Sequence, residues 1–185
     1  MNLLLLGNGL SFAGAIIMVL VGFVKSRKKI LGAQIIQFIL MGVGNLVLGG
    51  VTAFITNMLS IVRNLVCFQF KFTWPLKIAF IIAQVGLSIF AIMNGQGVIP
   101  DGRDPYGIII WFPIIGTTLF TLFLDVKSDV KLKVVIVISQ VFWLIYDYVI
   151  MNFASLTFDV LTIISTMVGI VMILRGKEKE EIVVA

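Results

Sequence analysis

The sequence predicts an all-α membrane protein with seven transmembrane helices. Its residues are 60% hydrophobic and only 12% charged, with a mean hydropathy of +1.14, whereas soluble domains carry roughly a quarter charged residues. A helix needs about 20 mostly apolar residues to cross a hydrocarbon core roughly 30 Å thick. The 185 residues can therefore hold about seven crossings, and no room remains for a soluble domain.

Apolar segments of suitable length follow one another along the chain. Helices are required, because the segments show no strict alternation and unpaired backbone is not tolerated in lipid. Gly49 and Gly50 divide an apolar run that is too long for one crossing, and Pro75 opens the fourth segment, since proline is tolerated at a helix start. The predicted helices cover about residues 2–24, 30–46, 51–69, 76–94, 106–124, 132–150 and 153–174.

Basic residues collect on one side of the predicted bundle. Successive loops alternate between the two sides, and residues 25–29, 71–77, 127–133 and 175–179 hold most of the 14 lysines and arginines. Because cytoplasmic loops are enriched in these residues, the N-terminus is predicted outside and the C-terminus in the cytoplasm. The basic residues follow the first apolar run, which argues for a retained first helix rather than a cleaved signal peptide.

The composition argues against several classes of function. Cys67 is the single cysteine, so no intrachain disulfide can form, and the chain has no histidine. Histidine is the usual general base and metal ligand, so we predict no enzyme activity, no metal and no cofactor. The net charge of +5 is explained by the basic loops, so nucleic acid is not a predicted partner.

A weak internal repeat relates the two ends of the chain. At an offset of 102, residues 52–66 align with residues 154–168 and pair Asn57 with Asp159, and at an offset of 103 Gln37 meets Gln140. The repeat predicts a three plus one plus three arrangement, with parallel units related by an axis along the membrane normal. The expected parts are a first three-helix bundle at 1–70, a linker helix in 71–100, a second three-helix bundle at 101–175 and a short cytoplasmic tail at 176–185.

Three stretches of the chain carry a resemblance to a known family. They are the Asn-x-x-x-x-x-Arg pattern from Asn57 to Arg63, "FPIIGTTLFTLF" in the fifth segment and "SQVFWLIYDY" in the sixth. With the helix layout, they resemble the YgjV family of bacterial inner-membrane proteins over nearly the whole chain. That family is similar to the PQ-loop group, which includes the SWEET sugar facilitators and the PnuC-type vitamin transporters.

The resemblance implies a multi-pass protein of the bacterial inner membrane, with two three-helix bundles around a central substrate pocket. The Pro-Gln dipeptide of the PQ-loop group is absent from this chain. Pro113 is the one proline inside a predicted span, so it is the candidate for a gating hinge.

Polar residues form one stripe on each of four predicted helices. Residues three, four and seven apart share a helix face. Stripes that faced lipid would leave each polar group unsatisfied, so we expect them to face one another or a water-filled cavity. The candidate substrate-binding residues are Gln37, Asn57, Ser60, Arg63, Asn64, Gln140, Trp143, Asp147, Asp159 and Thr162.

Two interpretations of these stripes stay open. Ser, Thr, Asn and Gln commonly only join helices, through hydrogen bonds of about 0.6 kcal/mol each. Asp147 and Asp159 favour a function, because an aspartate at a helix centre costs about 2.5 to 3.5 kcal/mol on insertion scales. Arg63 either extends to the cytoplasmic headgroups or lines the inner mouth of a pathway, where it attracts anionic groups or locks a gate.

Aromatic residues accompany the stripe of the sixth predicted helix. Trp143 lies one turn from Asp147, where its ring suits stacking on a ring-shaped or cationic ligand. Tyr146 and Tyr148 lie near the outer boundary, so we assign them to an interfacial belt.

The sequence favours a facilitator or transporter of a small polar, ring-containing metabolite that is vitamin- or nucleoside-like. It would work by alternating access between the two bundles, with Asp147 or Asp159 as the group that couples transport to protons. The alternative is a non-transporting scaffold or partner subunit whose stripes only hold helices together. An ion channel is disfavoured, because the chain shows no filter-like loop or acidic ring. The expected partners are the lipid bilayer and a small-molecule substrate, and homo-oligomerisation is left open.

Overall fold

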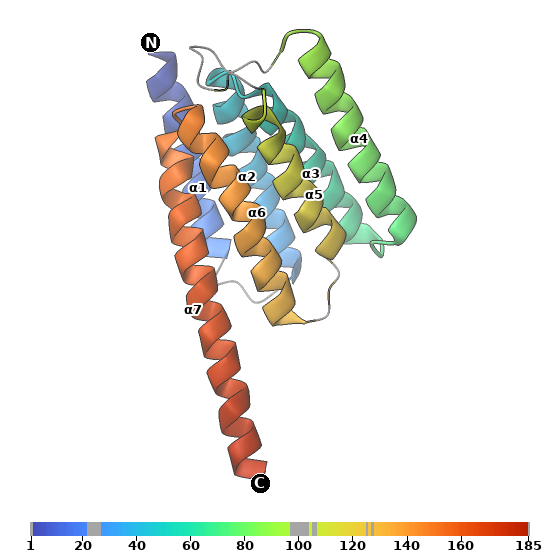
Figure 1. Ribbon diagram of the computed structural model, residues 1–185, viewed down its shortest axis with the longest axis vertical. Coiled ribbons are helices and arrows are strands. Elements are labelled where there is room, and N and C mark those ends of the chain that lie inside the picture. The colour runs from blue at the N-terminus through green and yellow to red at the C-terminus, as the bar shows by residue number, and fades with distance from the viewer. Residues whose placement is uncertain are drawn as a thin grey trace.

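The computed structural model describes residues 2–21, 27–96, 104, 107–124, 126 and 128–184. These residues form seven α-helices and one 3-10 turn, and the helices run alternately down and up the molecule (Figure 1). The elements are α1 (Leu3–Val21), α2 (Arg27–Val47), α3 (Val51–Gln69), α4 (Trp74–Met93), η1 (Ile109–Trp111), α5 (Phe112–Phe123), α6 (Asp129–Val149) and α7 (Phe153–Val184).

Four stretches are long and apolar enough to cross a membrane: Val51–Gln69, Trp74–Met93, Val130–Val149 and Phe153–Arg175. The remaining apolar helical stretches in the described residues, Leu3–Ile17, Gly32–Val47 and Ile109–Phe123, are shorter. The predicted all-helical class and the seven helices are confirmed, whereas within the described residues four of the seven predicted spans meet the length and hydropathy of a membrane crossing.

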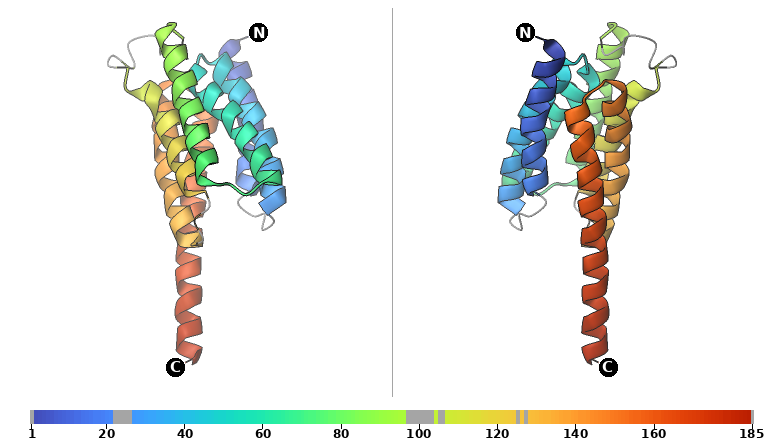
Figure 2. Two further views of the ribbon diagram at one scale, coloured as in Figure 1. Left: turned by 90° about the vertical axis from the view of Figure 1, so that its right-hand side faces the viewer. Right: turned by 90° about the vertical axis from the view of Figure 1, so that its left-hand side faces the viewer.

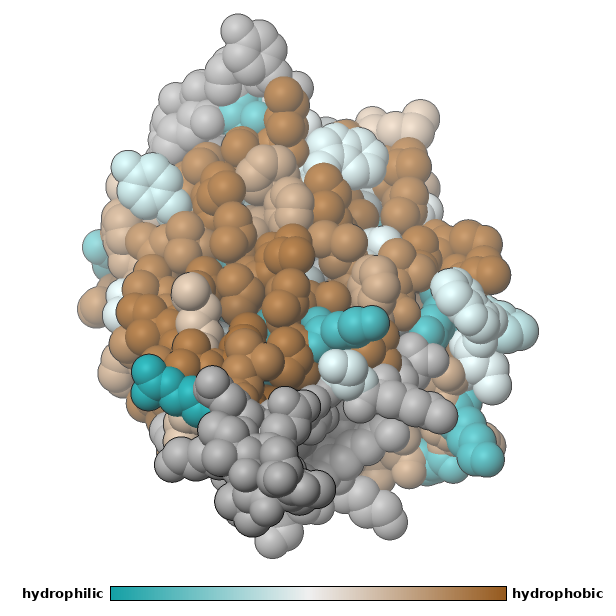
Figure 3. Space-filling view, turned by 60° about the horizontal axis from the view of Figure 1, so that its bottom comes forward, coloured by the Kyte–Doolittle hydropathy of each residue, from teal (hydrophilic) through white to brown (hydrophobic). Residues whose placement is uncertain are grey.

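The surface of the molecule is apolar and its interior is polar. Large hydrophobic side chains such as Ile82, Phe90 and Met172 are more than half exposed, and brown apolar residues cover most of the surface seen in Figure 3. Among the described residues, the buried set holds more polar and charged side chains than apolar ones. This distribution suits a hydrocarbon solvent, in which polar groups must find partners inside the protein.

The helices pack mainly with their sequence neighbours. Contacts join α1 to α2 and α2 to α3, and likewise α5 to α6 and α6 to α7, while α1 against α7 and α3 against α5 connect the two groups. In both views of Figure 2 the lower ends of α2 and α6 lie farther apart than their upper ends.

Helix α4 lies at the side of the molecule against α3 and α5 (Figure 1). Its buried polar residues Lys77, Gln84 and Ser88 are seven and four positions apart and so share one face. The Nε2 of Gln84 donates to the carbonyl of Ile114 at 2.9 Å, and the Nζ of Lys77 donates to the carbonyl of Leu122 at 3.0 Å. This helix, expected as a simple linker, therefore binds α5 through a polar face.

The helix boundaries repeat at the offset of 102 residues found in the sequence. Helices α2 and α6 begin and end at positions that differ by 102, and so do the last residues of α1 and α5 and the first residues of α3 and α7. The two groups of three helices thus share four of their six helix boundaries as well as their order, although α5 is shorter than α1 and α7 is longer than α3.

The turn between α2 and α3 ends α2 with a left-handed residue. Gly49 has a φ of 85°, the amide of Gly50 donates to the carbonyl of Asn45 at 2.7 Å, and the amide of Gly49 donates to the carbonyl of Leu46 at 3.0 Å. These two bonds define a Schellman motif, in which glycine is the residue best suited to positive φ.

The turn between α6 and α7 has the same geometry 102 residues later. Met151 has a φ of 61°, the amide of Asn152 donates to the carbonyl of Asp147 at 2.9 Å, and the amide of Met151 donates to the carbonyl of Tyr148 at 3.2 Å. A positive φ is uncommon for a residue other than glycine. The second turn therefore adopts the Schellman geometry although a methionine occupies the left-handed position.

Three predicted segments differ from the observed helices. The predicted span 106–124 is divided, because η1 precedes α5 and Pro113 lies in the first turn of α5, where its missing N–H breaks no helical bond. The predicted tail 176–185 is helical through Val184, since lysine and glutamate are good helix formers. Helix α2 begins at Arg27, ahead of the predicted apolar span 30–46, because Arg27 to Lys29 are basic but helical, and its apolar stretch Gly32–Val47 agrees with that span.

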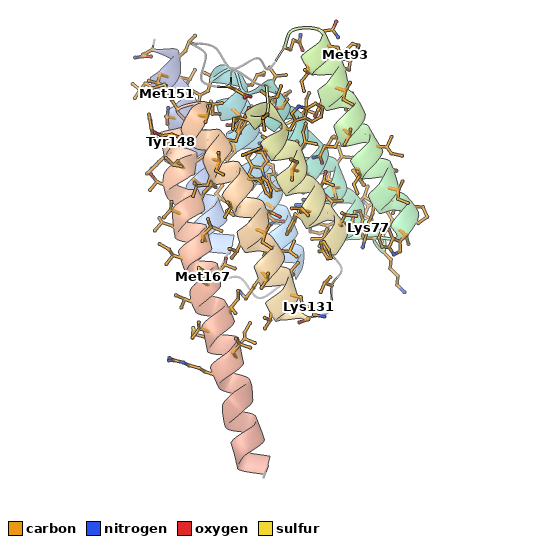
Figure 4. The ribbon with its side chains drawn as sticks, viewed as in Figure 1. Lys77, Met93, Lys131, Tyr148, Met151 and Met167 are labelled. Atoms are coloured by element: carbon orange, nitrogen blue, oxygen red, sulfur yellow. The ribbon has the colours of Figure 1, made fainter. Side chains whose placement is uncertain are left out.

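The two ends of the molecule differ in charge. Lys77 and Lys131 lie toward the lower end, whereas Met93, Tyr148 and Met151 lie toward the upper end (Figure 4). The predicted placement of the lower end in the cytoplasm stays a prediction.

Candidate functional site

A buried polar network joins the two groups of helices at the upper end. We call Asn8, Ser11, Asn45 and Asn152 the upper network. The Nδ2 of Asn152 donates to the Oγ of Ser11 at 3.0 Å and to the Oδ1 of Asn45 at 2.9 Å. Its Oδ1 accepts from the amide of Ser155 at 3.3 Å, so the same side chain caps the start of α7.

Asn8 of α1 also binds the turn between α6 and α7. Its Nδ2 donates to the carbonyl of Met151 at 3.4 Å, and its Oδ1 accepts from the amide of Ala154 at 3.1 Å. At this end, side chains from both groups hold the helices together by hydrogen bonds, as one of the two interpretations of the polar stripes expects.

Tyr146 lies inside the molecule rather than in an interfacial belt. It is 1% exposed, and its hydroxyl accepts a hydrogen bond from Thr52 at 3.4 Å. A Cβ placed on Gly50 would come within 2.8 Å of that hydroxyl, so glycine lets the ring reach the α2–α3 turn. Tyr148 is 64% exposed, as an interfacial residue should be. The position of Tyr146 and Tyr148 along the sixth helix predicts an interfacial belt for both, but the two residues lie on different faces of α6.

Asp147 and Asp159 come together between α6 and α7. Asp147 is fully buried, Asp159 is 1% exposed, and their carboxyl groups contact each other. The Nε2 of Gln140 donates to the Oδ1 of Asp159. Within the described residues, no hydrogen bond reaches either oxygen of Asp147 or the Oδ2 of Asp159. The side-chain amide of Asn152 lies close to Asp147 and donates to Ser11 and Asn45 of the upper network.

Arg63 points into the molecule. It is 2% exposed, its Nη1 donates to the Oγ1 of Thr121 on α5 at 2.8 Å, and its guanidinium lies 5.1 Å from the centre of the Phe120 ring. In the described part of the chain its Nε has no hydrogen-bond partner and no carboxylate forms an ion pair with it. The side chain is therefore a buried cation without a counter-charge, which is costly unless another group satisfies it.

Other candidate residues on α2 and α3 are buried, and most are bound within their own group of helices. The amide of Gln37 contacts the Sδ of Met41 at 3.6 Å, and the Nδ2 of Asn57 donates to the carbonyl of Ala53 at 2.9 Å. Asn64 donates to Gln34 at 3.1 Å and keeps an unpartnered Oδ1. Ser60 is 4% exposed.

On the other group of helices, Thr162 and Trp143 are partly buried. The Oγ1 of Thr162 has no partner among the described residues. Trp143 packs edge-on against Tyr146, with ring centres 6.3 Å apart, and its indole lies beside Gly116 of α5. Its predicted stacking on a ligand stays a prediction.

Further buried polar atoms on α5 and α6 lack hydrogen-bond partners within the described chain. They include Thr118 Oγ1 and Ser139 Oγ. Ser139 lies at the middle of α6 and packs close to Gly116. Each unsatisfied buried group costs about 1–3 kcal/mol, so these positions call for water or a ligand.

Sequence reasoning missed several of these residues. The sequence patterns do not single out Asn152, and they place Lys77 only among the basic residues 71–77. The spacing of Lys77, Gln84 and Ser88 could have revealed the polar face of α4. No sequence signal separates Asn152 from an ordinary turn asparagine, because its role depends on α1 and α2 packing beside the turn.

The family of the chain follows from comparison with known proteins. Residues 5–177 match the Imp-YgjV family model, described as bacterial inner membrane protein. The chain belongs to this family. No curated protein and no solved structure matches it. As an Imp-YgjV family member with several helices able to span a membrane, the protein is a multi-pass protein of the bacterial inner membrane. The predicted likeness to the YgjV family is confirmed, and the relation to PQ-loop proteins stays a prediction.

Proposed function

We propose that the protein is a transporter or facilitator of a small polar, ring-containing metabolite that works by alternating access. In this proposal α1–α3 and α5–α7 are parallel repeats that move against each other, and α4 connects them. The shared offset of 102 residues in helix boundaries and turns supports the repeat.

The observation that carries the proposal is the set of unsatisfied polar atoms inside the molecule. If the polar residues only held helices together, most of their hydrogen bonds would be made within the protein, as in the upper network, where the Nδ2 of Asn45 lacks a partner among the described residues but Asn152 makes three bonds. Arg63 Nε, Asn64 Oδ1 and Asp159 Oδ2 are buried without partners in the described residues. Water or a polar substrate would satisfy these groups, whereas a dry scaffold would leave them unsatisfied.

Arg63 favours a substrate with an acceptor or anionic group. Guanidinium groups bind carboxylates and phosphates through several donors at once, and Arg63 has a free Nε beside its bond to Thr121. Trp143 offers an aromatic surface for a ring-containing substrate. A vitamin or nucleoside-like metabolite satisfies both requirements.

Uptake into proteoliposomes tests the proposal. We expect the intact protein to accumulate at least one compound from a panel of vitamins, nucleosides, sugars and amino acids. Arg63→Gln is expected to reduce that uptake about tenfold or more, since losing a buried charge-assisted contact costs about 1.5–3 kcal/mol. Lys71→Gln, which removes an equal charge from an exposed position, should leave uptake unchanged. Uptake equal to that of empty vesicles for the intact protein and for Asn57, Trp143 and Asp159 variants would end the proposal.

A thermal-shift screen of the same panel in detergent provides a second measurement. A ligand that binds only the folded state raises stability by about 2.7 kcal/mol at a concentration 100 times its dissociation constant. We expect the transported compound to raise the apparent unfolding temperature, and Arg63→Gln to diminish that rise. A scaffold would show no shift with any compound of the panel.

A further inference from the structure

The carboxyl pair of α6 and α7 has a neutral counterpart in the other group of helices. At the offset of 102 residues, Asp147 corresponds to Asn45 and Asp159 corresponds to Asn57. The four residues are all buried, and Asn45 and Asp147 accept the equivalent Schellman bond. The repeat therefore carries amides in one half and ionisable groups in the other.

No positive charge is available to the carboxyl pair among the described residues. Elements α1, α5 and η1 pack against α6 and α7, and their described residues include no ionisable side chain. Asn45 of α2 contacts Asn152 of the α6–α7 turn, but the basic residues Arg27 to Lys29 stand at the other end of α2. Helix α3 reaches α6 through Thr52 and Tyr146. Arg63 of α3 is engaged with Thr121. On α6 itself, Tyr146 is adjacent to the pair, and Lys133 is 14 residues from Asp147 in sequence, or about 21 Å along the helix.

Two carboxylates in contact inside a protein repel each other and cannot both stay ionised unless a cation lies between them. The pair also has unsatisfied oxygens, since both oxygens of Asp147 and the Oδ2 of Asp159 lack donors in the described chain. Ser155, fully buried with an unpartnered Oγ, lies one turn before Asp159 and on the same face of α7. These observations call for a small positive ligand.

We propose that Asp147 and Asp159 form a single proton-binding site, in which the two carboxyl groups share one proton. Binding of one proton from water converts two carboxylates into one carboxylate and one carboxylic acid, and the acid O–H donates to the facing oxygen. Gln140 is the positioning residue, because its donated bond fixes the Oδ1 of Asp159 and leaves Oδ2 for the shared proton. Coupling of this proton to substrate movement rests on the proposed function, whereas its binding does not.

Infrared spectroscopy of the full chain in detergent tests the site without a substrate. We expect a protonated-carboxyl C=O band at neutral pH that shifts in D2O. The band should shift in frequency in Asp147→Asn and also in Asp159→Asn, because either substitution replaces the carboxylate that accepts from the acid O–H with an amide. These variants place an amide where Asn45 and Asn57 already stand in the other half, so monodisperse, folded protein is expected. Absence of the band from the wild type, or an unshifted band in either variant, would overturn the proposal.

A titration of the wild type supplies a measurement that does not depend on any variant folding. Raising the pH should remove the band in one step that releases one proton. Exchanging sodium for choline at constant pH should leave the band unchanged. A band that appears only without sodium would mean that a metal cation occupies the pair, and the proposal would be wrong. If the band is present but the protein transports none of the compounds, the proton-binding site is retained and only the proposed transport function is rejected.

Discussion

Replacing Asn152 with leucine is expected to lower the free energy of unfolding by about 3 kcal/mol or more. Leucine keeps the branching of the side chain but loses the hydrogen bonds to Ser11, Asn45 and the amide of Ser155. Each of these partners then stays buried without the hydrogen bond that Asn152 made to it, and each unsatisfied group costs about 1–3 kcal/mol. Fluorescence-detected unfolding in detergent measures the loss.

Asn94→Leu is the matched control for this substitution. Asn94 ends α4 at the same end of the molecule and donates to the carbonyl of Phe90 at 2.7 Å, but it is exposed. Its replacement should change stability by about 0.5 kcal/mol or less. Equal losses for the two variants would contradict the assignment of Asn152 to a buried network that joins the two groups of helices.

Replacing Gly44 with leucine should destabilise the protein by about 3 kcal/mol. Helices α1 and α2 approach closely at Gly7 and Gly44, as small residues permit in membrane proteins. A Cβ on Gly44 would come within 2.9 Å of the carbonyl oxygen of Gly7 and would collide with the Oγ of Ser11. Because one obstacle is backbone, α1 as a whole must move. The apparent unfolding temperature and the yield of monodisperse protein report the effect.

Gly9→Leu tests whether the effect belongs to the contact rather than to loss of a helical glycine. Gly9 is exposed on α1, and a Cβ there would meet nothing within 4 Å. Leucine at this position should preserve or raise stability by up to about 1 kcal/mol, since glycine is a poor helix former. A stable Gly44→Leu protein with unchanged α1 packing would contradict the close approach of α1 and α2.

The fold was largely predictable from hydropathy. The predicted third helix, 51–69, matches α3, because the glycine pair before it and the polar residues after it mark clear ends. Hydropathy located the apolar part of α2 but not its first turn, since Arg27 to Lys29 are helical without being apolar. It also could not show that η1 precedes α5, because a short 3-10 turn and the first turn of an α-helix have the same apolar composition.

The candidate site was predictable only one helix at a time. Helical spacing placed Asp147 on a polar face, and the repeat related Asp159 to Asn57. The contact between the two aspartates, however, depends on how α6 and α7 are rotated about their axes, which periodicity does not determine. The contact of Arg63 with Thr121 was likewise not predictable, because it depends on the relative height of α3 and α5 in the bundle.

The two related turns differ in backbone strain, because the left-handed position is Met151 in one and Gly49 in the other. An L-residue in this conformation carries a strain of about 1–2 kcal/mol, which Gly49 avoids at the equivalent place. Asn8 of the opposite group donates to the Met151 carbonyl, and the α2–α3 turn is likewise bound to the opposite group through Asn45 and Thr52. Both turns are therefore tied across the two groups, but only the α6–α7 turn stores backbone strain at that junction.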